Sequence, residues 1–264
     1  MKYLIYQYWD GDINEGAKFS SKLMKAYAKQ IESDYVFELN PKFRTDLGKY
    51  SPHYGQFKIV YDSLFNKYDK ILFADTDVFP VENLNKNIFD EFTSDVGMCT
   101  EPYQPKARLK MKGSINSKND EKWAKAIEKK WKAKMPRGED GLLKVYNSGV
   151  VLYSQKGIEQ MRKRFVDFKK YVNYIKSCDL PVFYTCDQPY LHAMLKVCEL
   201  NYQEMENGWN SYIHYILDEN QNKKINDTRN KNTKFVHIQL RGADNFSEDV
   251  LWRITNRSIA EWGI

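Results

Sequence analysis

The sequence YDKILFADTDVFP, residues 68–80, decides the fold of this chain. Its apolar run, Ile71 to Ala74, predicts a short strand buried within a parallel sheet. Two carboxylates, Asp75 and Asp77, follow this strand directly. Charge at the end of a buried strand costs free energy unless a partner pairs it. Divalent cations such as Mn²⁺ and Mg²⁺ prefer carboxylate oxygens, so the pair indicates either a metal site or a capped turn.

The segments around this strand alternate between strand and helix patterns. Strands are predicted from period-two or continuously apolar runs, and helices from apolar residues at spacings of three and four. In chain order the predicted elements are strand 2–8, helix 14–31, strand 34–39, helix 54–67, strand 71–74, strand 95–100, helix 119–135, strand 142–153, helix 156–174, helix 187–198 and strand 234–240, followed by a helical tail. This order predicts one α/β domain over residues 1–264 with a mostly parallel, doubly wound central sheet.

A basic segment interrupts the alternation. The chain has a net charge of +6, but residues 106–137 hold 12 Lys or Arg and three Asp or Glu, a local charge of +9. We therefore predict a basic helical insertion at 105–141. Its apolar stripe of Trp123, Ile127 and Trp131 favours packing onto the domain; the alternative is contact with an anionic membrane surface or an anionic acceptor glycan. The segment resembles no nucleic-acid-binding module, so we expect no nucleic-acid partner.

The cysteines and the hydropathy pattern indicate the compartment. Cys99, Cys178, Cys186 and Cys198 lack the close paired spacing of a zinc site or a disulfide framework. No apolar run approaches the ~20 residues that a membrane-spanning helix needs. The first residues enter a strand pattern without the layout of a signal peptide. We therefore expect a cytoplasmic protein with reduced thiols.

Three further motifs carry polar groups that suit a binding site. The run Asn-Ser-Gly at 147–149 precedes an apolar strand, and its glycine permits close approach of the backbone. The run Asp-Gln-Pro at 187–189 begins a helix, where Asp187 suits an N-cap. A late strand carries one histidine, His237. His53, His192 and His214 are interpreted as structural.

Taken in this order, the motifs resemble the nucleotide-sugar-dependent glycosyltransferases of the GT-A fold, in particular the glycogenin and lipopolysaccharide galactosyltransferase group. The likeness covers most of the chain except the basic insertion and the tail. It implies a single GT-A (Rossmann-like) domain that uses Mn²⁺ or Mg²⁺ and a UDP- or GDP-sugar. It also implies hexosyl transfer to a glycan, glycolipid or protein hydroxyl, with retention of configuration.

The resemblance also assigns roles to individual residues. It implies that Asp75, Asp77 and His237 bind the metal and that Asp187 and Gln188 are catalytic. The donor-binding residues that it implies are Gln7, Tyr8, Lys58, Asp75, Asn147, Ser148 and Arg241. One departure concerns the Gly-x-x-Lys-Pro-Trp run that follows the histidine in the glycogenin-like group. This chain has Ile238-Gln239-Leu240-Arg241-Gly242-Ala243 there, so Arg241 is the candidate phosphate clamp.

Two other functions stay open at this point. A phosphatase of the haloacid-dehalogenase type also carries a strand followed by D-x-D-x-[TV] and would use Asp75 as its nucleophile. That family places the motif on its first strand, whereas about 70 residues precede it here. The third possibility is a catalytically inactive sugar-binding protein on the GT-A fold. An inactive protein would not need to keep the carboxylates Asp75, Asp77 and Asp187, because clustered charge costs free energy.

Overall fold

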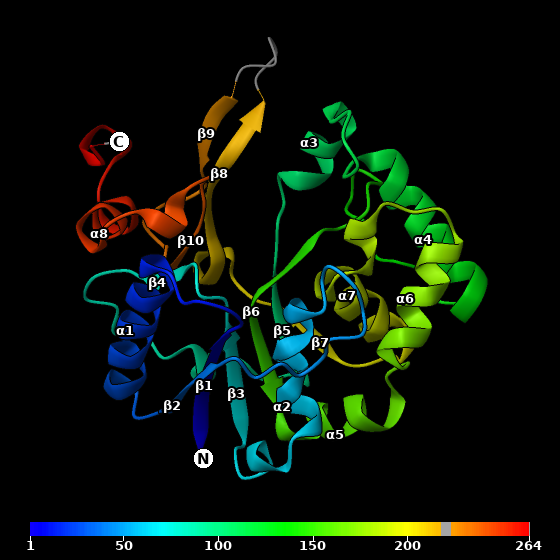
Figure 1. Ribbon diagram of the computed structural model, residues 1–264, viewed down its shortest axis with the longest axis horizontal. Coiled ribbons are helices and arrows are strands. Elements are labelled where there is room, and N and C mark those ends of the chain that lie inside the picture. The colour runs from blue at the N-terminus through cyan, green and yellow to red at the C-terminus, as the bar shows by residue number, and fades with distance from the viewer. Residues whose placement is uncertain (218–222, 264) are drawn as a thin grey trace.

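A six-stranded sheet forms the centre of the computed structural model, which describes residues 1–217 and 223–263 (Figure 1). Its strand order is β2-β1-β3-β6-β5-β7. The strands are β1 (Tyr3–Trp9), β2 (Asp34–Leu39), β3 (Lys70–Ala74), β5 (Val96–Thr100), β6 (Tyr146–Ser154) and β7 (Tyr202–Glu204). Strand β6 pairs antiparallel with both β3 and β5, while the other neighbours are parallel. The prediction of a mostly parallel central sheet is confirmed.

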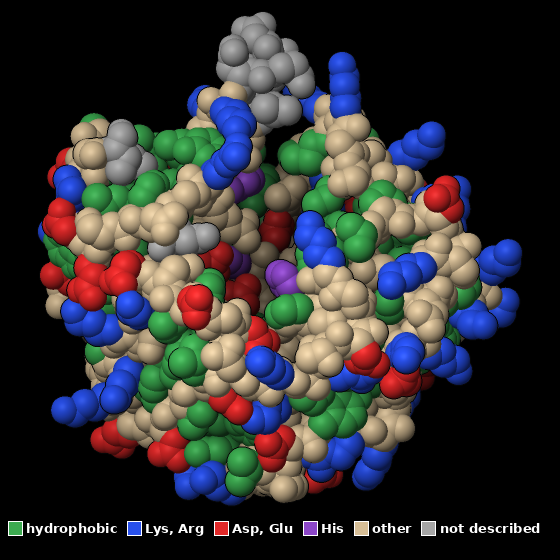
Figure 2. Space-filling view, in the orientation of Figure 1, with side chains coloured by type: hydrophobic (Ala, Val, Ile, Leu, Met, Phe, Trp, Pro, Cys, Tyr) green, Lys and Arg blue, Asp and Glu red, His purple; other side chains and the backbone are tan. Residues whose placement is uncertain are grey.

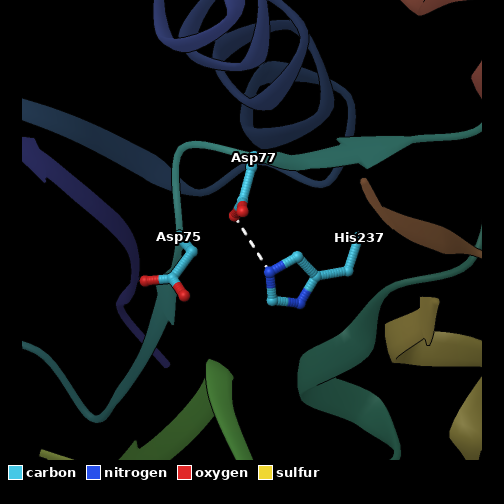
Figure 3. A group of neighbouring side chains, drawn as sticks. All are labelled: Asp75, Asp77 and His237. Atoms are coloured by element: carbon cyan, nitrogen blue, oxygen red, sulfur yellow. Dashed lines mark ion pairs between the residues drawn. The ribbon is translucent and has the colours of Figure 1, made fainter. Parts of the chain in front are cut away.

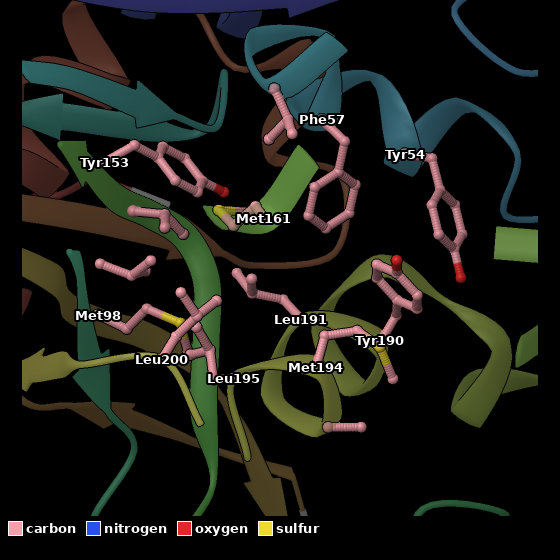
Figure 4. Packing of buried hydrophobic residues seen from close by; sticks show 14 of the residues in the cluster. Tyr54, Phe57, Met98, Tyr153, Met161, Tyr190, Leu191, Met194, Leu195 and Leu200 are labelled. Carbon is pink, nitrogen blue, oxygen red and sulfur yellow. The ribbon is translucent and has the colours of Figure 1, made fainter. Parts of the chain in front are cut away.

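Helices cover both faces of this sheet, which explains why β3 is apolar on both sides. Leu72 and Ala74 join a core shared with helix α1 (Glu15–Gln30). Ile71 and Phe73 point the other way, into a larger core. That core is shared with α2 (Lys58–Tyr61), α5 (Gln155–Arg164), α6 (Phe168–Ser177) and α7 (Asp187–Val197) (Figure 4). Helices therefore pack against β3 on both faces of the sheet, and this packing fixes the position of its carboxyl end.

A second sheet continues from the first at the acidic motif. Its order is β4-β10-β8-β9, with β4 (Val78–Pro80), β8 (Ser211–Leu217), β9 (Lys223–Asp227) and β10 (Phe235–Gln239). Strand β10 pairs antiparallel with β4, so that His237 lies opposite Val78. Helix α8 (Glu248–Asn256) packs on this sheet through a third apolar cluster. The second sheet therefore brings a late strand to the end of β3.

Two predicted helices are each broken in the structure. The 54–67 helix is divided into the 3-10 helix η1 (Pro52–Phe57), α2 and the 3-10 helix η2 (Ser63–Phe65). Asp62 is extended there, and its side chain accepts a hydrogen bond from the Leu64 amide. The 156–174 helix is divided into α5 and α6, since Asp167 caps α6 by accepting from the Lys170 amide. In both cases an aspartate side chain competes with the helical hydrogen bonds.

The basic insertion consists of α3 (Gln104–Lys110) and α4 (Ser117–Trp131), which lie between β5 and β6 in the chain. Trp123 and Ile127 are buried against the large core, and the Trp123 indole donates a hydrogen bond to the Tyr171 hydroxyl at 3.0 Å. A buried ion pair at 2.9 Å joins Arg108 to Asp120. The apolar stripe therefore packs onto the domain, as predicted.

The charged face of the insertion points outward. Lysine and arginine side chains project at the edge of the molecule where α4 lies (Figure 2). Within the residues that the structure describes, no helix is both long and apolar enough to cross a membrane. All four cysteines are free thiols.

Candidate functional site

Asp75, Asp77 and His237 meet where the two sheets join (Figure 3). One ligand atom from each lies within 4.8 Å of the other two, and the Nε2 atom of His237 is 3.0 Å from the Oδ1 atom of Asp77. Asp75 follows β3, Asp77 precedes β4 and His237 lies on β10. The amide of Ile238 donates to the carbonyl of Asp77 at 2.9 Å, which fastens β10 to the acidic motif. The structure thus brings together the three residues predicted as metal ligands.

The electrostatics of this group suit a divalent cation. Burial, followed by the charge of Asp77 and then that of Asp187, raises the pKa of Asp75 well above its usual range. Burial alone would lower the pKa of His237, but the adjacent Asp77 and Asp75 carboxylates outweigh it, so the pKa is raised. A cation would stabilise both ionised carboxylates, and an oxygen-and-imidazole set of this kind fits Mn²⁺.

Gly149 has no side chain, and the side chains of Asp75 and His237 occupy the space beside it. The Asp75 amide donates to the Gly149 carbonyl at 2.7 Å, so the two backbones are in direct contact. A Cβ atom at position 149 would lie 2.5 Å from Cε1 of His237 and 2.8 Å from Oδ2 of Asp75. No side chain fits there without moving a ligand. The motif was recognised in the sequence, but this steric role was not.

A chain of buried amides supports His237 from behind. The Nδ1 atom of His237 lies 3.1 Å from Oδ1 of Asn210, and the Asn210 amide donates to Oδ1 of Asn147 at 3.1 Å. The Asn147 amide in turn donates to Glu101 at 2.9 Å. The predicted donor-binding residue Asn147 is therefore engaged inside the protein, and it supports the ligand group. Asn210 and Glu101 were missed because no local motif marks them.

Ser148 points to the opposite face of β6, as alternation along a strand requires. Its hydroxyl donates to Oδ2 of Asp187 at 2.9 Å, and the buried Gln56 amide donates to the same oxygen. Gln56 is held in turn by the Tyr153 hydroxyl, which donates to it at 2.8 Å. Burial is the main cause that raises the pKa of Asp187. The predicted residues Ser148 and Asp187 therefore form one network beside the metal-ligand group.

A pocket of about 380 Å³ opens at the metal-ligand group. Tyr8, His53, Asp75 and Asp77 are among the residues that line it. Acidic and histidine side chains are visible in the hollow near the middle of the face shown in Figure 2. The pocket lies outside the carboxyl ends of β1 and β3, the usual ligand position in an open α/β sheet. Its volume is in the range of small-molecule sites.

Of the predicted donor-binding residues, Tyr8 and Asp75 line this pocket, whereas Gln7 and Lys58 are among those that do not. Gln7 is fully buried and donates to the Asp75 carbonyl and to the Ser20 hydroxyl, each at 3.0 Å. The Lys58 ammonium is paired with Glu38 and lies 3.6 Å from Asp62. Buried partners engage Gln7 and nearby carboxylates hold Lys58, and the donor-binding roles of both residues stay predictions. Gln7 positions the backbone of the acidic motif.

Gln188 and Arg241 are not among the residues that line the large pocket. Successive residues of a helix point about 100° apart, so Gln188 does not share the direction of Asp187. It lines a separate small cavity with Arg108 and His192. Arg241 is exposed just beyond β10, two residues before Ala243, which lines the large pocket. The catalytic role of Gln188 and the phosphate-clamp role of Arg241 stay predictions.

The comparisons with known proteins concern the fold. No protein-family model matches this chain, and no curated protein sequence matches it. Mouse xyloside xylosyltransferase 1 has a similar structure, with a TM-score of 0.51 at 12% identity over 90% of this chain and 97% of that one. A glycosyltransferase involved in the glycosylation of the major capsid of PBCV-1 gives 0.48 at 12% identity over 90% and 92%. The galactosyltransferase LgtC, with donor and acceptor sugar analogues, gives 0.45 at 16% identity over 79% and 75%.

The likeness to the xylosyltransferase, together with the strand order, defines the fold. The chain has the GT-A fold of glycosyltransferases, with an Asp-Asp-His group at its sheet junction. The resemblance inferred from the sequence motifs is confirmed at the level of the fold. The haloacid-dehalogenase alternative requires a different fold and is set aside.

Proposed function

We propose that this protein is a metal-dependent glycosyltransferase that moves a hexose from a nucleoside-diphosphate sugar to a hydroxyl group. One observation carries the proposal: Asp75, Asp77 and His237 converge at the mouth of a pocket on the GT-A fold. Two carboxylates and an imidazole at such a place are suited to a cation that is shared with substrate phosphates.

Each residue of the site has a separate task in this proposal. Asp75, Asp77 and His237 would hold Mn²⁺ or Mg²⁺, which when bound would neutralise charge on the leaving nucleoside diphosphate. Tyr8 lines the pocket and offers an aromatic face to the nucleotide base. Asp187 is held by Ser148 beside the ligand group, where it would contact the transferred sugar.

The finer points of the proposal depend on the resemblance to the glycogenin and lipopolysaccharide galactosyltransferase group. The donor is a UDP- or GDP-sugar, transfer retains configuration, and the acceptor is a glycan, glycolipid or protein. Arg241, which is exposed just beyond β10, would pair with the donor diphosphate. The reduced cysteines favour a cytoplasmic protein. The outward lysines of α4 would allow an electrostatic contact with an anionic membrane or glycan.

The test is a screen of UDP-, GDP- and TDP-sugars, each with Mn²⁺ or Mg²⁺, for release of nucleoside diphosphate. At least one donor should be consumed only when a metal is present, and the same pair should raise the melting temperature. Asp77→Asn should abolish both effects. Asp179→Asn is the matched control, since Asp179 is exposed and far from the pocket lining.

Two results would overturn the proposal. One is the absence of both release and thermal shift across the whole screen. The other is full activity in Asp77→Asn, because that would remove the acidic motif from the chemistry. Donor binding without release, in wild-type protein with several acceptors present, would favour the non-catalytic sugar-binding alternative on the same fold.

A further inference from the structure

His53 lines the 380 Å³ pocket at the metal-ligand group, although the sequence predicted only a structural role for it. It lines the pocket together with Asp75 and Asp77, and 56% of its side chain is exposed. An imidazole at the mouth of a binding pocket can accept a proton from a bound molecule. Its surroundings therefore decide what it can do.

The carboxylate of Asp187 lies behind the His53 ring. The Nδ1 atom of His53 is 3.9 Å from Oδ1 of Asp187. The other oxygen, Oδ2, accepts from the Ser148 hydroxyl and from the Gln56 amide. These two bonds orient the carboxylate so that Oδ1 is the oxygen nearer to His53. This separation is longer than a hydrogen bond, and such contacts often shorten when a substrate binds.

The two residues are held at this separation by direct links between η1 and the start of α7. The Tyr54 hydroxyl donates to the Thr185 carbonyl at 2.9 Å, and Gln56 donates to Asp187. Tyr54 and Gln56 are both fully buried. From the other side, the Tyr8 hydroxyl donates to the His53 carbonyl at 3.1 Å. Because buried partners already fix the positions of His53 and Asp187, ordering these side chains costs little free energy when the substrate binds.

The charged groups around His53 come from three segments. Asp187 at the start of α7 lies 3.9 Å from the ring, and Asp10, Asp75 and Asp77 line the same pocket. The ring of Tyr50, from the preceding loop, packs edge-on at 5.2 Å between centroids. Because the bound cation would neutralise Asp75 and Asp77, Asp187 is the carboxylate that would stabilise a positive charge on the His53 ring.

We propose that His53 is the catalytic base of the transfer reaction, with Asp187 as the residue that orients it. The proposal rests on the proposed glycosyltransferase function. As the acceptor oxygen bonds to the anomeric carbon, its O–H bond breaks and the proton moves to Nε2 of His53. The bond from the anomeric carbon to the phosphate oxygen breaks, and its electron pair leaves with the nucleoside diphosphate. The acceptor oxygen enters on the face that the diphosphate leaves, so that the configuration is retained. In the substrate complex the Nδ1–H group of His53 would donate to Asp187.

The experiment compares two nucleophiles with His53→Ala. Water must lose a proton when it attacks the donor, whereas azide attacks as an anion and needs no base. Donor hydrolysis in the presence of Mn²⁺ should therefore fall about 100-fold or more in the variant. Consumption of the donor by azide should stay within about threefold of the wild-type rate. Calorimetry should give the same dissociation constant for the donor with Mn²⁺.

Lys49→Gln, an exposed substitution in the same loop, should leave all three measurements unchanged. Equal losses with water and azide, or hydrolysis within threefold of wild type, would overturn the assignment of His53. Those outcomes differ from failure of the proposed function, in which wild-type protein releases no nucleoside diphosphate from any donor.

Discussion

The Nδ1 atom of His237 lies 3.1 Å from the side-chain oxygen of Asn210. Because the Asn210 amide donates to Asn147, its oxygen is the acceptor, and the proton must be on Nδ1 of the histidine. The Nε2 atom, which faces Asp77, is then the one available to a metal ion. The amide chain therefore selects the tautomer that can bind a cation.

This relationship predicts that Asn210→Ala weakens the binding of Mn²⁺ by about 10- to 100-fold, the usual effect of losing a residue that supports a metal ligand. Isothermal titration calorimetry with Mn²⁺ measures the change directly. Asn201→Ala, at an exposed position, is the matched control. Unchanged affinity in Asn210→Ala would mean that the ring of His237 is oriented by β10 alone.

The glycine next to the ligands gives a second prediction. Gly149→Ala should lose Mn²⁺ binding, because the new Cβ would lie 2.5 Å from the His237 ring. The fold should persist, as judged by circular dichroism, since the clash is confined to the site. Gly113→Ala is the control, because nothing lies within 4 Å of a Cβ there. If Gly149→Ala bound the ion normally, the ligands would have to sit elsewhere.

The basic insertion gives a third prediction. Trp123→Ala should lower the free energy of unfolding by about 3 kcal/mol or more, because the side chain is buried and bonded to Tyr171. Lys125→Ala, on the exposed face of the same helix, should change it by less than about 0.5 kcal/mol. Urea unfolding measures both values. A negligible effect of Trp123→Ala would mean that the apolar stripe of α4 does not stabilise the domain and is available to an external partner.

His192 gives a prediction for the pH dependence of stability. Burial, followed by the nearby charges of Lys196 and Arg108, lowers the pKa of His192 to about 3. The unfolded chain therefore binds a proton more readily below the ordinary histidine pKa, and stability falls as the pH falls. Between pH 7.5 and pH 5.0 this residue should lower the free energy of unfolding by about 2 kcal/mol.

Urea unfolding at both pH values tests this in wild type and in His192→Phe. The substitution keeps an aromatic ring between Trp123 and Tyr146 and removes the titrating group. The loss of stability on acidification should be smaller in the variant by about that amount. Equal losses in the two proteins would show that His192 is protonated in the folded state.

The parts of the fold that follow local patterns could be predicted from the sequence. The strand expected at 34–39 is β2, and the apolar run before Asp75 is β3, because their burial is encoded by their own residues. The antiparallel direction of β6 and the second sheet could not be predicted, since both depend on pairing between distant segments.

The same distinction applies to the site. Asp75, Asp77 and His237 stand in recognisable motifs and meet in the structure. Asn210 and His53 lie in segments without such motifs, and only tertiary packing brings them to the site. The motif gives the adjacency of Gln188 to Asp187 in sequence but not the direction of its side chain, which lines a separate cavity.

The pairing of β10 with β4 has a consequence for how the protein matures. About 160 residues separate Asp77 from His237, so a growing chain on the ribosome holds the acidic motif long before its third ligand emerges. The amino-terminal part can collapse first, as early segments usually do. We expect a divalent cation to bind only after β10 has paired with β4. The rate of cation binding during refolding would therefore report the rate at which β10 adds to the sheet.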